Sequence, residues 1–191
     1  MNRPAPPRDC RGVTDRARRD ALLVVRAQLG DRRALAELVS HWHDPIWRYI
    51  RRMLDRPGAA DDVAQEAWAA ALRALPRLRD PDRFAPWLMT IARRAVLDQL
   101  RERYRPEPGG EATVHHSDEA DEALDRAIVA DGLAGLPPVE REVLILYYLH
   151  DLSAEDCAQI LGVPRGTVKS RLFRARRMLR AHLIERGLTH E

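Results

Sequence analysis

The stretch from Ser153 to Arg180 constrains this chain most, because it has the pattern of two helices joined by a tight turn. Ser153 and Asp156 have the spacing of a capping box, which starts a helix. Gly162 stands where a helix ends in a left-handed residue, and Pro164 suits the first turn of a second helix. That second helix carries an apolar stripe at helical spacing, formed by Val168, Leu172, Ala175, Leu179 and Leu183. The stretch therefore predicts a helix-turn-helix.

Basic side chains surround this apolar stripe. From residue 165 to the end the chain has eight arginines and lysines against two acids. A helix-turn-helix places its second helix in the major groove of DNA, whereas the deep, narrow major groove of RNA resists such entry. The pattern favours DNA binding, and a helical hairpin with a solvated charged face is the alternative.

The remaining sequence predicts further helices and no strands. Of the 191 residues, 45% are hydrophobic and 32% are charged, which is typical of a chain that folds over most of its length. Helical periodicity starts at Asp20, and Gly30 separates a first helix from a second that Asp31 can cap. Pro45 is expected to bend or break this second helix near His43 or Asp44.

Composition divides the chain into two helical parts. Residues 1–18 are rich in Pro and Arg and predict a disordered tail. A stretch with two prolines, two glycines and no periodicity predicts a flexible linker at 104–119. The fold class is therefore all-α, with two small helical domains at 19–103 and 120–186, the second containing the helix-turn-helix.

The residue types argue against an enzyme, a cofactor or a metal site. The N-terminal half offers no nucleophile–base set, metal cluster or glycine-rich phosphate loop. Cys10 and Cys157 fit neither a metal nor a disulfide spacing, and His115 and His116 lack companion ligands. No apolar run approaches the ~20 residues that span a bilayer, and the first residues do not form a secretory signal. We expect a cytoplasmic protein without membrane insertion.

Three segments together resemble the ECF (extracytoplasmic function, group IV) sigma factors of the bacterial sigma-70 family. The family's polymerase-binding helix resembles ADDVAQEAWAAALRAL, and its −10 helix resembles FAPWLMTIARRAVLDQLRER. Its −35 domain resembles LPPVEREVLILYYLHDLSAEDCAQILGVPRGTVKSRLFRARRMLR. The match spans about residues 20–104 and 121–184. It implies an RNA polymerase sigma factor that directs promoter recognition and transcription initiation.

The resemblance also implies partners and their contact residues. The partners would be promoter DNA, the β′ and β subunits of core RNA polymerase, and an anti-sigma factor. The residues that would contact core polymerase are Asp61, Asp62, Gln65 and Glu66. Acids near a helix N-terminus also complement the helix dipole, which is the plainer explanation of the three carboxylates.

For DNA, the resemblance implies two separate sets of residues. The −10 set comprises a base-capturing loop and the helix after it, with Leu78, Arg79, Asp80, Arg93 and Arg94. Leu78 stands where the family often has phenylalanine and Arg94 where it more often has asparagine, so the −10 base preference stays open. The −35 set comprises the base-reading positions Lys169, Ser170, Phe173 and Arg174 and the phosphate-contacting positions Arg165, Thr167 and Arg171.

The alternative function is a stand-alone helix-turn-helix regulator that binds DNA as a dimer. Two separated DNA-binding segments and a polar helix with three acids and a glutamine argue against it. The linker length agrees with the sigma-factor hypothesis, because the 15 residues 104–118, when extended, reach about 50 Å. This reach is comparable to the roughly 55 Å of a 16-base-pair spacer.

Overall fold

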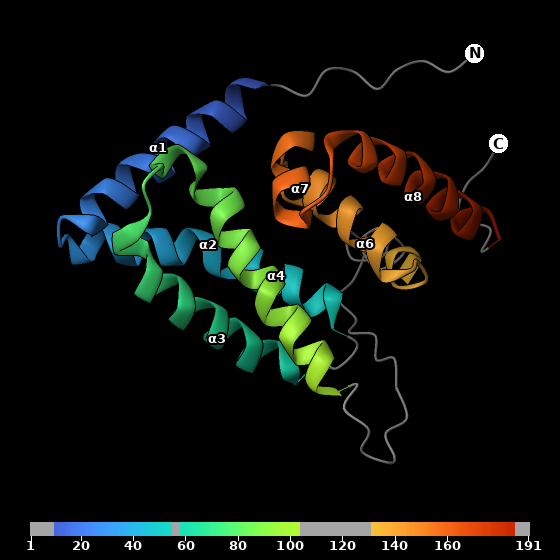
Figure 1. The fold of residues 1–191 in the computed structure, drawn as a ribbon, viewed down its shortest axis with the longest axis horizontal. Coiled ribbons are helices and arrows are strands. Elements are labelled where there is room, and N and C mark those ends of the chain that lie inside the picture. Colours follow the sequence, from blue (N-terminus) through green and yellow to red (C-terminus); the bar gives the residue numbers. More distant parts are fainter. Residues whose placement is uncertain (1–9, 55–57, 104–130, 186–191) are drawn as a thin grey trace, which may run out of the picture.

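The computed structural model describes residues 10–54, 58–103 and 131–185, and all regular elements in these ranges are helical (Figure 1). The all-α prediction is therefore confirmed. The N-terminal module contains α1 (Cys10–Gln28), α2 (Arg32–Met53), α3 (Ala59–Ala74), the 3₁₀ turns η1 (Leu75–Arg77) and η2 (Pro81–Arg83), and α4 (Phe84–Arg103). The C-terminal module contains α6 (Pro138–Leu144), the π-helical turn η3 (Ile145–Leu149), α7 (Ala154–Leu161) and α8 (Arg165–Glu185). The expected linker at 104–119 lies outside the described residues.

Helix α1 begins at Cys10, so residues 10–18, expected to belong to a disordered tail, are helical. Arg16, within this stretch, and Asp20, just after it, have partners on α2 that a tail would lack. The Arg16 guanidinium lies 4.4 Å from the centre of the Trp42 ring, and the Trp42 indole N–H donates to Asp20 at 3.1 Å. Cation–π contacts and buried hydrogen bonds of this kind hold a helix that composition alone does not favour. Residues 1–9 lie outside the described part.

Helix α2 starts where the sequence predicts and runs on through Pro45. Gly30 has a φ of +92°, and the Asp31 carboxylate accepts from the backbone N–H groups of Arg33 and Ala34 at 2.9 and 3.1 Å. Of the bend or break expected near Pro45, the break is wrong, because the helix continues to Met53. A proline inside a helix costs about 3 kcal/mol. Here the apolar side chains on both sides of it are buried, and their burial outweighs that cost: Leu38, Trp42, Ile46, Tyr49 and Ile50.

The helix-turn-helix forms as predicted. Ser153 and Asp156 make both hydrogen bonds of a capping box at the start of α7. Gly162 ends α7 with a φ of +67°, a conformation that glycine adopts without strain. Pro164 directly precedes α8, and its carbonyl accepts from the N–H of Val168. Three residues of the predicted stripe are fully covered, namely Val168, Leu172 and Ala175.

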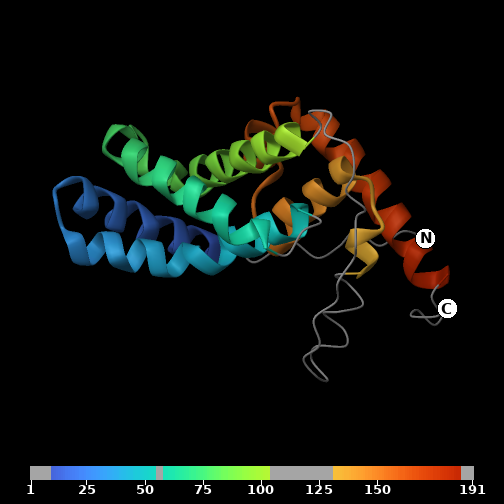
Figure 2. The same ribbon diagram turned by 90° about the horizontal axis from the view of Figure 1, so that it is seen from below.

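The two modules lie against each other in the structure. Helix α4 contacts α7, and the C-terminal part of α2 meets α6 (Figures 1 and 2). The buried residues of both modules form one continuous apolar cluster. The candidate DNA-binding helices α4 and α8 are therefore held in one compact arrangement.

Candidate polymerase and promoter interfaces

The four candidate polymerase-binding residues share the exposed side of α3. The opposite side of this helix is buried through its alanines and Val63. Gly58 precedes the helix, and no side chain caps its first backbone N–H groups. Asp61 accepts a 2.7 Å hydrogen bond from the Trp47 indole instead. The helix start thus has no side-chain cap, although four polar residues stand near it. All four are exposed and available to a partner: Asp61, Asp62, Gln65 and Glu66.

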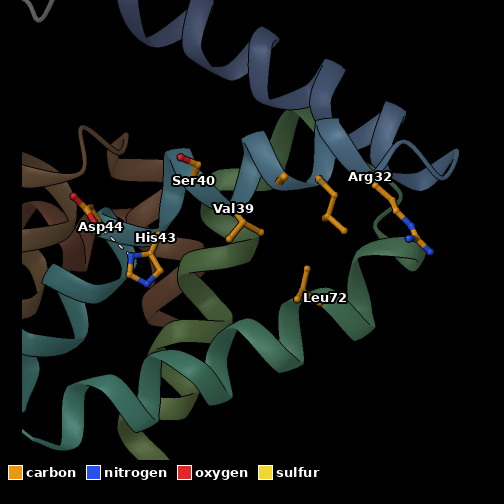
Figure 3. A pocket seen from close by; sticks show the side chains of 8 residues that line it. Arg32, Val39, Ser40, His43, Asp44 and Leu72 are labelled. Atoms are coloured by element: carbon orange, nitrogen blue, oxygen red, sulfur yellow. Dashed lines mark hydrogen bonds and ion pairs between the residues drawn. The ribbon is translucent and has the colours of Figure 1, made fainter.

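An apolar groove continues this face and was not foreseen from the sequence. It lies between α2 and α3, has a volume of about 730 Å³, and ends at His43 and Asp44 (Figure 3). Leu72, half exposed on its floor, follows Gln65 by seven residues and therefore lies on the same side of α3. Leu35 and Val39 of α2 line the opposite wall. An apolar lining suits protein side chains rather than phosphate or metal.

The candidate −10 loop is fixed to α1 by one side chain. The Gln28 amide donates to the carbonyl oxygens of Leu75 and Leu78 at 2.9 and 2.8 Å. Leu78 is half-buried, whereas Arg79 and Asp80 are exposed. The structure thus brings these three loop residues together at the start of α4. Nothing in the sequence indicated Gln28, because its partners are backbone atoms about fifty positions away.

The two candidate arginines on α4 differ in their surroundings. Arg94 is exposed. Arg93 is half-buried, and its Nε lies 2.9 Å from a carboxylate oxygen of Glu142 on α6. Arg93 is therefore bound to the other module rather than open to a nucleic acid.

The candidate −35 residues all lie in the first half of α8. Arg165, Lys169, Ser170 and Phe173 are exposed, and Phe173 has 61% of its surface in contact with solvent. Thr167 and Arg171 are half-buried beside the stripe. A large apolar ring on a basic helix face suits contact with a base or a thymine methyl group.

Arg174 has a partner that the sequence did not indicate. Its guanidinium forms an ion pair with Glu140 of α6, a carboxylate that is 6% exposed. The Arg174 side chain as a whole remains 58% exposed. Arg174, the base-reading candidate, is therefore paired with the buried Glu140, while its side chain still reaches the surface.

Neither a metal cluster nor a spanning helix occurs in the described ranges. Within residues 10–54, 58–103 and 131–185, no three His, Cys, Asp or Glu side chains gather in a way that could hold a metal ion. In the same ranges no helix is both long and apolar enough to cross a membrane. His115 and His116 lie outside them.

Comparison with known proteins agrees with this geometry. The sigma-70 region 2 family matches residues 38–106, and the sigma-70 region 4 family matches residues 126–179. The ECF RNA polymerase sigma factor SigC of Mycobacterium tuberculosis is 35% identical over 172 residues, covering 87% of this chain and 92% of SigC.

Two solved structures share the fold. CnrH, solved with the cytosolic domain of CnrY, is 30% identical with a TM-score of 0.67, covering 87% of this chain and 98% of CnrH. The sigma factor RpoE of Bartonella quintana, solved with the anti-sigma factor NepR, is 25% identical with a TM-score of 0.72, covering 78% and 96%. The chain belongs to the ECF group of the sigma-70 family and is an RNA polymerase sigma factor.

Proposed function

We propose that this sigma factor binds core polymerase through the exposed side of α3 and recognises the promoter through the loop at 75–83, α4 and α8. One observation carries the polymerase assignment. The polar side of α3 is presented to solvent, caps no backbone group and continues into an apolar groove. A polar rim beside an apolar anchor site is the usual anatomy of a protein interface.

The promoter assignment rests on two sets of residues, most of them exposed; the half-buried members are Leu78, Arg93, Thr167 and Arg171. The −10 set is the fixed loop with Leu78, Arg79 and Asp80, together with Arg93 and Arg94. The −35 set is the outer face of α8, where arginine and lysine can hold phosphates and arginine can read guanine. We propose that the linker at 104–119 lets the domains 19–103 and 120–186 separate far enough to reach both elements at once.

The chain is proposed to act as a factor rather than an enzyme, in the bacterial cytoplasm where polymerase and DNA are found. An anti-sigma factor is the proposed regulator. This is supported by CnrH and RpoE, which were each solved with a binding partner, named in the case of RpoE as an anti-sigma factor.

Run-off transcription tests the function directly. Purified chain and core polymerase, given the promoter region of the chain's own gene, should yield a defined transcript that core polymerase alone does not make. A transcript-free reaction, combined with tight sequence-specific binding of the free chain to an operator, would favour the stand-alone dimeric regulator instead.

Arg174 and Arg171 are expected to differ in what they recognise. Arg174→Ala should cost roughly 1–3 kcal/mol on the preferred −35 sequence and flatten discrimination at one base pair. Arg171→Ala should weaken all sequences about equally and reduce the salt slope by about one. The measurement is holoenzyme binding to single-substituted −35 duplexes at several salt concentrations.

The matched control also neutralises Glu140, the buried partner of Arg174. Because Arg174→Ala leaves Glu140 buried without its partner, the double variant Glu140→Gln/Arg174→Ala separates misfolding from lost readout. Full base preference in both Arg174 variants would show that this arginine is only structural.

A further inference from the structure

Inside the C-terminal module, a buried acid of α6 supports an exposed arginine of α8. Glu140 lies in the first turn of α6, and its side chain is only 6% exposed. Its carboxylate accepts a hydrogen bond from Nη2 of Arg174, a residue 34 positions further along the chain. The packing of α6 against α8 therefore places a buried anion beside a cation that reaches the surface.

This pairing sets Arg174 apart from the other basic residues of its helix. Within residues 10–54, 58–103 and 131–185, no other arginine, lysine or histidine of α8 forms an ion pair with a carboxylate. Arg171, three residues earlier, is one of those without such a pair. An arginine that is not held can turn toward a phosphate, whereas one that is held at a nitrogen keeps one orientation of its planar fork.

Glu140 is itself carried by a well-anchored turn of helix. Pro138, the first residue of α6, has a backbone φ fixed by its ring. Arg141 donates to the carbonyl oxygens of Ala134 and Leu136 at 2.6 and 3.2 Å, which ties α6 to the residues before it. A supporting side chain orients its partner well only when it stands on a rigid element, and Glu140 meets this condition.

The ion pair leaves Arg174 enough donors to bind a base. A guanidinium has five N–H groups, and a bidentate contact with O6 and N7 of guanine uses two of them. Fixing a long side chain before binding lowers the entropic cost of that contact. The negative charge of Glu140 also offsets the charge of the guanidinium, which weakens its attraction to phosphates.

We propose that Glu140 is a positioning residue that makes Arg174 specific for guanine in the −35 element. This inference rests on the proposed base-reading role of Arg174. Phosphates are alike in every sequence, so an arginine that binds them adds affinity without specificity. Glu140 keeps Arg174 from acting in that way and directs its fork to a base edge.

The test uses Glu140→Met in the holoenzyme, with Glu185→Gln as the matched control. Methionine keeps the length of the side chain and removes its charge and its acceptor oxygens. Glu185→Gln also removes one negative charge from the C-terminal module, at an exposed position at the end of α8. Binding is measured at several salt concentrations to −35 duplexes in which 7-deazaguanine, which lacks N7, replaces each guanine in turn.

In the wild-type holoenzyme, 7-deazaguanine at one position should weaken binding roughly tenfold, because a hydrogen bond to a charged group is lost. Glu140→Met should reduce this penalty to about twofold. The magnitude of its salt slope should grow by about 0.9, the value for one more phosphate contact, because the released guanidinium binds the backbone. A merely structural role of Glu140 would weaken binding to every duplex and would not steepen the slope. Glu185→Gln should keep the wild-type penalty.

Glu140→Gln keeps an oxygen that can accept from Arg174, so it should give a smaller change in the same direction and serves if Glu140→Met fails to fold. Combined with Arg174→Ala, neither change should alter base preference further. If Arg174→Ala loses the preference while both Glu140 variants keep the full penalty, the proposed function stands and the positioning role is overturned. Full preference in Arg174→Ala overturns the base-reading role and this inference with it. A wild-type holoenzyme without a penalty at any guanine overturns the assignment to guanine.

Discussion

Replacing Asp62 and Glu66 by arginine is expected to abolish binding to core polymerase while the helix content of the chain stays unchanged. Both side chains are exposed on α3, and exposed substitutions usually change stability by no more than about 0.5 kcal/mol. Like charges placed across an interface cost several kcal/mol. A loss of at least ~100-fold in affinity follows from that cost.

The matched control is the double variant Asp98→Arg/Glu102→Arg. It reverses two exposed acids that are also four residues apart, on α4 instead of α3. Affinity is measured by titrating labelled chain with core polymerase, and helix content by far-ultraviolet circular dichroism. Wild-type affinity in the α3 variant would mean that its acids serve only the helix dipole.

Acidification from pH 6.5 to about 4 is expected to lower the free energy of unfolding by up to ~3 kcal/mol through His150 alone. The ring of His150 stacks edge-on against Tyr49, with centres 6.1 Å apart, at the contact between the modules. Its Nε2 is buried without a hydrogen-bond partner among the described residues. Burial, followed by the charge of Arg52, lowers the pKa of His150 from 6.5 to about 4.

The sign follows from which state takes up the proton first. In the unfolded chain His150 is protonated below about 6.5, whereas in the folded chain it stays neutral down to about 4. The unfolded state therefore binds more protons in this window, and stability falls as the pH falls through it. Asp20, whose pKa burial raises above 3.8, acts with the opposite sign at the acidic end.

Comparison of variants isolates the histidine from Asp20. Urea unfolding at several pH values should show that His150→Gln loses most of the pH dependence between 6.5 and 4. His43→Gln, which changes an exposed histidine of α2, should keep it. If the free energy of unfolding of both variants depends on pH as that of wild type does across this range, protonation of His150 does not contribute to acid unfolding.

The sequence predicted well those features that depend on residues close together in the chain. The capping box of Ser153 and Asp156, the left-handed Gly162 and the Asp31 cap depend on residues within three positions of each other. The backbone geometry of a few neighbouring residues determines these helix ends, so they could be predicted without knowing how the helices pack. The exposure of the polar side of α3 also followed from helical periodicity.

Features that depend on distant residues could not be predicted. The continuation of α2 through Pro45 results from the packing of side chains on both sides of it. The pairing of Arg93 with Glu142 spans 49 positions, and that of Arg174 with Glu140 spans 34. The family resemblance assigned both arginines to DNA, and the sequence contained no sign of the carboxylates that approach them.

The two hydrogen bonds of Gln28 have a consequence for the speed of promoter capture. They fix the backbone of the loop at Leu75 and Leu78 in the free protein. The conformational entropy of this loop is therefore lost during folding and not during the encounter with DNA. In the proposed base capture, an unpaired base would meet a loop whose shape already exists, so the association rate should be governed by how often the duplex opens rather than by how fast the protein rearranges.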